Sequence, residues 1–241
     1  MKGIGFKFND KHSYNDFGLI LDSKEILDPA KVKIKVSVPY MNGSYDFSTI
    51  GSGGDPVFGE RQIQVILGFP TGSKEELHSM YTLVLEWLKD TGRQKLIFDD
   101  IFNWYFIAEV EAVSKFEEMY KMGKLTVSFV AQPFKYNVDM FGDDIWDTFN
   151  FLTDYTQYDN TFDIDALEKD VLLDIYNNGR SICPIINSSV DGMKLIFNEV
   201  QYDMVQGDNK FWNLRLGNGK NTLKFSGANG TIKIIFRSEI L

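Results

Sequence analysis

Hydrophobic and polar residues alternate along much of the chain, and this period of two predicts β-strands that have one apolar face. The alternation is clearest in residues 31–38, where lysines or serine separate the apolar positions Val32, Ile34, Val36 and Val38. We expect that apolar face to be buried and the lysine face to be wet. Asn42-Gly43 follows and predicts a hairpin turn.

A helical spacing replaces the alternation in residues 73–90. Ser73 and Glu76 match a capping box at the start of this predicted helix, and Gly92 is well placed to end it. The apolar positions form one stripe at helical spacing, which is typical of a helix docked on a sheet. They are Leu77, Tyr81, Val84, Leu85 and Leu88.

Further strands are predicted at residues 95–98, 104–113 and 124–130, with Asp99-Asp100 as a turn between the first two. The first domain, residues 1–133, is therefore expected to be mainly β with one helix. Pro133 marks the predicted boundary.

The second predicted domain is residues 134–241. Its first part, about 134–165, is acidic and weakly periodic, and we interpret it as a linker with irregular structure. Short strands then recur between turn signals such as Asn218-Gly219 and Asn229-Gly230. That spacing favours an antiparallel sandwich or jelly roll.

Composition narrows the function. The 241 residues are 44% hydrophobic, enough for one large or two small domains with real cores. The net charge of −9 disfavours specific nucleic-acid binding. Cys183 is the one cysteine, so no internal disulfide forms, and no apolar run reaches the roughly 18 residues that span a bilayer. We expect a soluble chain without membrane contact, assembled in a reducing cytoplasm.

The glycine-rich run at residues 51–59 raises the question of phosphate binding. A phosphate loop needs a helix directly after its glycines. Here the next residues, 60–69, read as a strand, since Ile63, Val65 and Leu67 alternate with less apolar neighbours. We therefore interpret the run as a long loop between two strands that a partner can order.

No catalytic or metal site is predicted. The chain has two histidines without metal spacing, and Cys183 lies in an apolar setting that favours an inert thiol. Asp159, Asp163 and Asp165 do not form an EF-hand, although incidental Ca²⁺ binding and a glycosidase carboxylate pair stay open as alternatives. A cofactor is not expected.

Sugar binding through aromatic side chains is another alternative. The candidates are Trp146, Tyr155 and Tyr158 in the acidic linker, and Trp212 in the sequence FWNLRL. Trp212 shares its alternation with Leu214 and Leu216, which favours a core position over an exposed platform.

Four motifs, in order along nearly the whole chain, make the sequence similar to the distal tail proteins of long-tailed, non-contractile bacteriophages and prophages. They are GFKFNDKHSYNDFGLIL at the start, VPYMNGSYDFS followed by the glycine run and ERQIQVILGF, the helix end EWL before LIFDD and WYFIAEV, and GNGKNTLKFSGANGTIKIIFRSEIL at the end. The family's usual Pro-Gly step is replaced by the five residues 39–43.

The resemblance implies a tail-tube-like β-sandwich or split barrel with one helix, which closes into a hexameric ring, and a galectin-like or carbohydrate-module-like sandwich. It implies a structural virion protein at the tail tip, not an enzyme, that joins the tail tube protein to tail-tip and receptor-binding proteins while DNA passes through the lumen. A cell-wall polysaccharide-binding module is the alternative. The candidate oligomer-interface residues are Gly51, Gly53, Gly54, Phe58, Arg61, Asp99 and Asp100.

Overall fold

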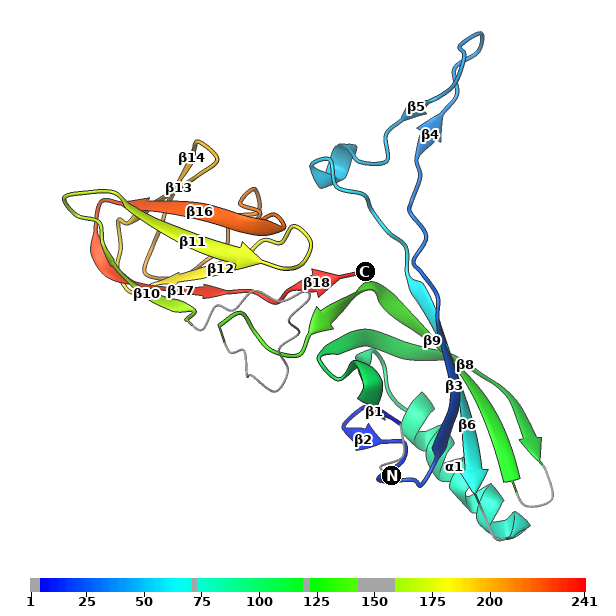
Figure 1. Ribbon diagram of the computed structural model, residues 1–241. Coiled ribbons are helices and arrows are strands. Elements are labelled where there is room, and N and C mark those ends of the chain that lie inside the picture. The colour runs from blue at the N-terminus through cyan, green and yellow to red at the C-terminus, as the bar shows by residue number, and fades with distance from the viewer. Residues whose placement is uncertain (1–4, 71–72, 119–121, 143–158) are drawn as a thin grey trace. The chain divides into compact units, whose positions relative to one another are not determined.

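The computed structural model describes residues 5–70, 73–118, 122–142 and 159–241 (Figure 1). The chain divides into two compact units. Unit 1 comprises residues 1–135 with residue 241, and unit 2 comprises residues 136–240. The described residues are mainly strands, as the sequence predicts, and α1 is the one α-helix among them.

Unit 1 is built on one antiparallel sheet with the strand order β2-β1-β7-β8-β9-β6-β3. The strands are β1 (Phe6–Phe8), β2 (Lys11–His12), β3 (Ile20–Ile26), β6 (Arg61–Pro70), β7 (Gln94–Phe98), β8 (Trp104–Glu118) and β9 (Met122–Asn137). A short 3-10 helix, η2 (Asp99–Ile101), joins β7 to β8 where a turn is predicted.

The sheet is strongly curled. Three strand-to-strand steps separate β1 from β9 in the sheet order. In a flat sheet that distance would be about 14 Å, since neighbouring strands lie about 4.8 Å apart. The rings of Phe8 and Phe129 are nevertheless only 5.3 Å apart, and Phe6 lies 5.9 Å from Phe129. This closure agrees with the expected split barrel.

Helix α1 (Lys74–Lys89) covers the inner face of the curled sheet. Ser73 caps it, accepting a hydrogen bond from the Glu76 N–H (3.2 Å), as predicted. The helix ends at Lys89, before Gly92. Asp90 is its C-cap, and the Asp90 N–H donates to the Glu86 carbonyl. The apolar stripe is buried at Leu77, Val84 and Leu88, which pack against the inner residues of β6, β8 and β9.

Trp87 is the helix residue whose role the sequence pattern did not reveal. Its ring stacks on Phe17 (4.6 Å) and Phe6 (5.7 Å), and its indole N–H donates to the Phe8 carbonyl (2.8 Å). One side chain thus ties the helix to β1 and to the turn before β3. A helical periodicity alone cannot show such a tertiary contact.

An extended hairpin continues the β3–β6 ladder beyond the sheet (Figure 1). It contains β4 (Lys35–Val36), β5 (Tyr45–Asp46) and the 3-10 helix η1 (Ile50–Ser52). Backbone hydrogen bonds hold its two sides together, from Val32 to Val57 (2.8 Å) and from Phe47 to Ile34 (2.8 Å). We call residues 31–58 the arm. The apolar face predicted to be buried in residues 31–38 is exposed in the single chain, because β4 pairs with β5 alone.

Unit 2 is a sandwich of two four-stranded antiparallel sheets, ordered β10-β17-β12-β15 and β11-β16-β13-β14. Side chains from both sheets, including Ile186, Ile232, Leu195 and Phe225, share one buried cluster, so the sheets face each other. The strands are β10 (Thr161–Asp165), β11 (Val171–Asn177), β12 (Ile185–Ser188), β13 (Lys194–Phe197), β14 (Val200–Asp203), β15 (Gly207–Asn209), β16 (Gly219–Ser226) and β17 (Asn229–Ile235).

The irregular linker expected at about 134–165 is replaced by strands at both of its ends, while residues 138–142 and 159–160 carry no helix or strand. β9 runs through Pro133 to Asn137, and β10 occupies the last five residues. Pro133 lies beyond Ala131, where the pairing of β9 with β6 ends, so it owes no ladder hydrogen bond to β6. β18 (Glu239–Ile240) pairs with β9, whose last two residues belong to unit 2.

Candidate assembly and ligand-binding surfaces

The arm carries a continuous exposed apolar face. Its exposed side chains include Val32 (41%), Ile34 (54%), Val36 (47%) and Val38 (43%) on one side of the hairpin, and Tyr45 (55%), Phe47 (40%) and Ile50 (72%) on the other. A two-stranded hairpin is marginal by itself in water. A contiguous apolar surface of this kind marks an interaction site.

The arm also differs in charge from the rest of the chain. It holds three lysines and two aspartates and so carries +1, while the remaining residues carry −10. Asp46 is held at the base of the hairpin turn by Ser48, whose N–H donates to its carboxylate (3.0 Å), and by Lys33 (3.3 Å). Ser48 chiefly, with help from Lys33, lowers the pKa of Asp46 to about 2. With Asp46 ionised, the arm keeps its net charge of +1, which is opposite in sign to that of the remaining residues and suits contact with an acidic surface.

The glycine run lies on the arm and is followed by strand β6, not by a helix. Gly51, Gly53 and Gly54 are exposed, and Gly53 and Gly54 adopt positive φ angles of 67° and 97° that favour glycine. Phe58 instead packs at the base of the arm, where its ring meets Phe134 at 5.7 Å. The contact of these four residues with another copy stays a prediction.

The interface candidate Asp99 forms hydrogen bonds within unit 1. Asp99 accepts hydrogen bonds from the Gly5 N–H (2.8 Å) and from His12 Nε2 (3.0 Å). His12 Nδ1 accepts from the N–H groups of Tyr14 and Asn15, both at 3.1 Å, so the ring proton sits on Nε2. Asp99 thus fastens the start of the chain to η2. The sequence pattern carried no signal for this contact of His12.

Asp100 and Arg61 complete the interface candidates. Asp100 forms an ion pair with Lys24. Arg61 is 4% exposed, lies over the Phe106 ring (5.4 Å), and has no hydrogen-bond partner at Nε or Nη2 among the described residues. Burial lowers the pKa of Arg61, and the charge of Asp28 opposes that effect. A role for Asp100 or Arg61 at an interface stays a prediction.

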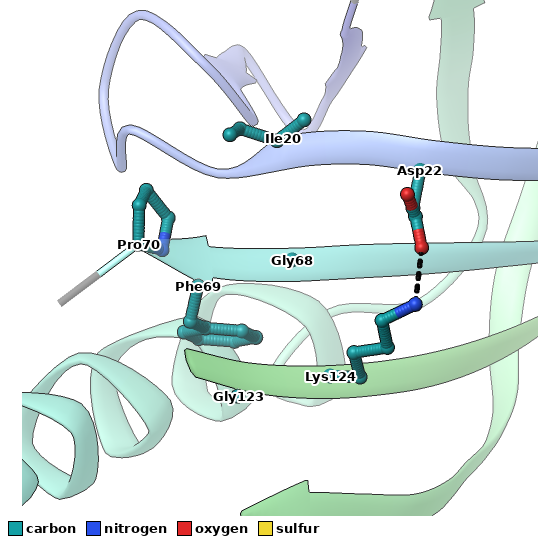
Figure 2. A pocket seen from close by; sticks show the side chains of 7 residues that line it. All are labelled: Ile20, Asp22, Gly68, Phe69, Pro70, Gly123 and Lys124. Atoms are coloured by element: carbon teal, nitrogen blue, oxygen red, sulfur yellow. Dashed lines mark hydrogen bonds and ion pairs between the residues drawn. The ribbon is translucent and has the colours of Figure 1, made fainter. Parts of the chain in front are cut away.

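A small apolar pocket opens across β3, β6 and β9, with a volume of about 110 Å³ (Figure 2). Figure 2 shows Ile20 and Pro70 at one end and the ion pair between Asp22 and Lys124 (2.6 Å) at the other. Gly68 leaves room between them. Ligand pockets for small molecules are usually about 300 Å³ or larger, so this one suits a single apolar side chain.

The aromatic candidates for glycan or partner contact have different outcomes. Trp146, Tyr155 and Tyr158 lie outside the described residues. Trp212 is 73% exposed, so the expected core position is wrong. A turn interrupts the alternation, because the Leu214 N–H donates to the Phe211 carbonyl (2.9 Å). The turn returns Leu214 to the core and leaves the tryptophan outside.

Cys183 and the acidic side chains are the remaining reactive groups that the sequence offered. Cys183 is half-buried beside the Phe211 carbonyl (3.1 Å), and burial raises the pKa of its thiol. Within the described parts of the chain, no three His, Cys, Asp or Glu side chains gather closely enough to hold a metal. In those same parts, no helix is long and apolar enough to cross a membrane.

Comparisons with known proteins report what the chain is similar to. Residues 14–131 match the family model of the phage tail protein RIFT-related domain, and the matched region contains the arm, α1 and the part of the curled sheet from β3 to Ala131 in β9. No curated protein matches the chain.

Among solved structures, the chain is similar to the Dit protein of phage SPP1, described as a paradigm of the hub adsorption apparatus in phages that infect Gram-positive bacteria. The TM-score is 0.68 at 13% identity, and the match covers 100% of both chains. It also matches the baseplate of phage p2 in its activated conformation with Sr, with a TM-score of 0.40, 13% identity and 99% of both chains covered.

These findings confirm, at the level of the fold, the resemblance to siphophage distal tail proteins. The family and the SPP1 neighbour are tail proteins rather than enzymes.

Proposed function

We propose that this protein is a structural hub subunit at the tip of a phage tail. Six copies form a closed ring that joins the tail tube to the proteins of host adsorption, and DNA passes through its lumen. Assembly takes place in the cytoplasm of the bacterial host. The tail protein domain and the Dit-like fold support the hub role.

The observation that carries the ring is the arm. Its apolar residues alternate as in a strand with one buried face, yet the single chain leaves that face exposed. We assign its cover to a second copy of this chain, because the residues outside the arm carry a net charge of −10, opposite in sign to the +1 of the arm. An arm that binds a different surface on the next copy makes a head-to-tail contact, and such contacts generate a closed ring when the rotation from copy to copy closes.

The uncovered face of the sheet is consistent with a wet lumen. Ile63, Val65 and Leu67 of β6 pack under α1, so the intervening Gln62 and Gln64 lie on the opposite face and are exposed. An overall net charge of −9 keeps DNA from adhering to the ring.

A matched pair of arm variants tests the ring. Ile34→Asp places a charge on the apolar face, and Ser37→Asp places the same charge on the other face of the same side of the hairpin. Both changes lower the net charge of the arm from +1 to 0. Both residues are exposed in the single chain, so neither change is expected to unfold it. Light scattering and negative-stain images should show rings for the parent and for Ser37→Asp, and single chains for Ile34→Asp.

The ring proposal would be contradicted by a parent chain that remains monomeric at high concentration and also when it is mixed with its tail tube protein. If Ile34→Asp forms rings as readily as the parent, the proposal of a ring still holds, but the arm is not part of its interface.

A second candidate function, binding of cell-wall polysaccharide, is favoured by one observation, the exposure of Trp212. Retention of the full chain on purified bacterial cell walls tests it. No retention above that of an unrelated β-sandwich protein would reject it.

A further inference from the structure

Trp212 is presented on a rigid base. It lies in the turn after β15, closed by the hydrogen bond from Leu214 to Phe211. Phe211 in turn packs on Tyr202, with the ring centroids 4.8 Å apart. The indole therefore projects from a position that the fold fixes, and an exposed aromatic held in this way loses little conformational entropy when a ligand binds it.

Two cationic side chains adjoin the same turn. The ammonium group of Lys210 lies over the Trp212 ring, 4.4 Å from its centroid. Arg215 is tethered to Ser181 through Nε (3.0 Å to Oγ) and Nη2 (2.8 Å to the carbonyl). The Cys183 thiol lies 3.1 Å from the carbonyl of Phe211, which directly precedes Trp212. Ser181, the residue that holds Arg215, lies two positions before Cys183. Contacts therefore link Arg215 to the turn that carries Trp212.

The surroundings of the indole favour a polar ligand over an apolar partner surface. Protein hot spots are typically tryptophans at the centre of a desolvated patch. The neighbours of Trp212 in its own turn, Lys210 and Asn213, are instead exposed polar side chains. A pyranose ring suits an exposed indole with polar neighbours, since its C–H face packs on the indole while its hydroxyl groups bind polar side chains.

We propose that Trp212, Lys210 and Arg215 form a binding site for an anionic saccharide, with the sugar ring on the indole and a phosphate or carboxylate group against the two cations. The proposal deepens the second candidate function and rests on it. The positive charges specify the ligand, because a neutral glycan gains only hydrogen bonds from Lys210 and Arg215, whereas an anion is also attracted by the charge of both.

The test uses the full chain and three soluble polymers: glycosylated poly(glycerol phosphate), polygalacturonate and neutral dextran. The first two separate phosphate from carboxylate as the source of charge. We expect binding to at least one charged polymer, weakening as salt rises, and none to dextran. Trp212→Ala should weaken that binding about tenfold or more, as loss of an aromatic anchor does. Lys210→Ala should weaken it less and flatten its salt dependence.

Controls come from the same unit. Leu172→Ala removes another exposed large apolar side chain, and Lys194→Ala removes another exposed lysine. Both should bind as the parent does. The inference is overturned if the parent binds neither charged polymer, if Trp212→Ala binds normally, or if Leu172→Ala loses as much. The inference is also overturned if Trp212→Ala loses binding to a tail protein while its binding to the polymer is unchanged, since the site would then be a protein contact.

Ring formation by the same variants keeps the two proposals apart. Trp212→Ala is expected to form rings as the parent does. If only the saccharide site is wrong, the rings persist without polymer binding. If the parent forms no rings yet binds the polymer, the ring proposal fails alone.

Discussion

Strand β6 and the arm carry the same sequence pattern and have opposite environments. Ile63, Val65 and Leu67 of β6 are all 0% exposed, whereas Ile34 and Val36 of the arm are about half exposed. β6 lies between β3 and β9 and beneath α1, but β4 has only β5 beside it. Alternation therefore predicts that a face is to be buried, and it does not say whether the covering surface belongs to the same chain.

The largest expected effect is a difference in the free energy of unfolding between a variant of the β6 face and a variant of the arm face. Leu67→Ala leaves a cavity under α1 and should lower the free energy of unfolding of unit 1 by about 2–5 kcal/mol. Ile34→Ala should change it by less than about 0.5 kcal/mol, because the side chain contributes little in the single chain. Urea unfolding at concentrations where the chain is unassembled measures both. Equal losses would mean that the arm is packed within one chain, and the contrast with β6 would disappear.

A second contrast lies between two tryptophans. Trp87→Phe keeps most of the ring but removes the N–H that binds the Phe8 carbonyl, so a buried acceptor loses its partner. The expected loss is about 1–3 kcal/mol. Trp212→Phe, the matched control at an exposed position, should leave thermal unfolding unchanged. A small effect at Trp87 would show that water or a backbone shift satisfies Phe8, and that ring stacking alone docks the helix.

These contrasts show how far the sequence could predict the structure. The helix from Ser73 onward and the strands around Ile63 and Leu125 follow from local periodicity, which depends only on neighbours along the chain. The position of Trp87 between Phe6 and Phe17 depends on residues about 70 to 80 positions away, and no local pattern contains it.

Two other features were missed for local reasons. Trp212 follows an apparent alternation that a single turn interrupts, and turn formation at Phe211 has no glycine or proline to announce it. The β13–β14 hairpin turns at Asn198 and Glu199, both with positive φ (49° and 66°), although Glu is an unusual residue for that conformation.

The candidate interface residues Asp99 and Asp100 were chosen from a predicted turn, which exists, but their partners His12 and Lys24 come from distant strands.

The smallest expected effect concerns the acid stability of the arm. The pKa of Asp46 is lowered from 3.8 to about 2, so its carboxylate favours the folded hairpin at neutral pH. Because the folded pKa lies below the unfolded one, this contribution is complete above about pH 5 and is lost as the pH falls through 3.8 towards 2. Hydrogen exchange of the Phe47 amide, which donates to Ile34 across the hairpin, should therefore lose protection over that range in the unassembled chain.

Asp46→Asn is the control, since an amide oxygen still accepts from Ser48 but does not titrate in this range. Its hairpin protection should be weaker at neutral pH and should not change between about pH 5 and 2 once intrinsic exchange is corrected. The carboxyl carbon of Asp46, followed by NMR, gives the same answer directly. A midpoint near 3.8 would mean that Ser48 and Lys33 do not hold the carboxylate in solution. The arm would then keep its shape only where another copy covers it, and the contrast with β6 would become sharper.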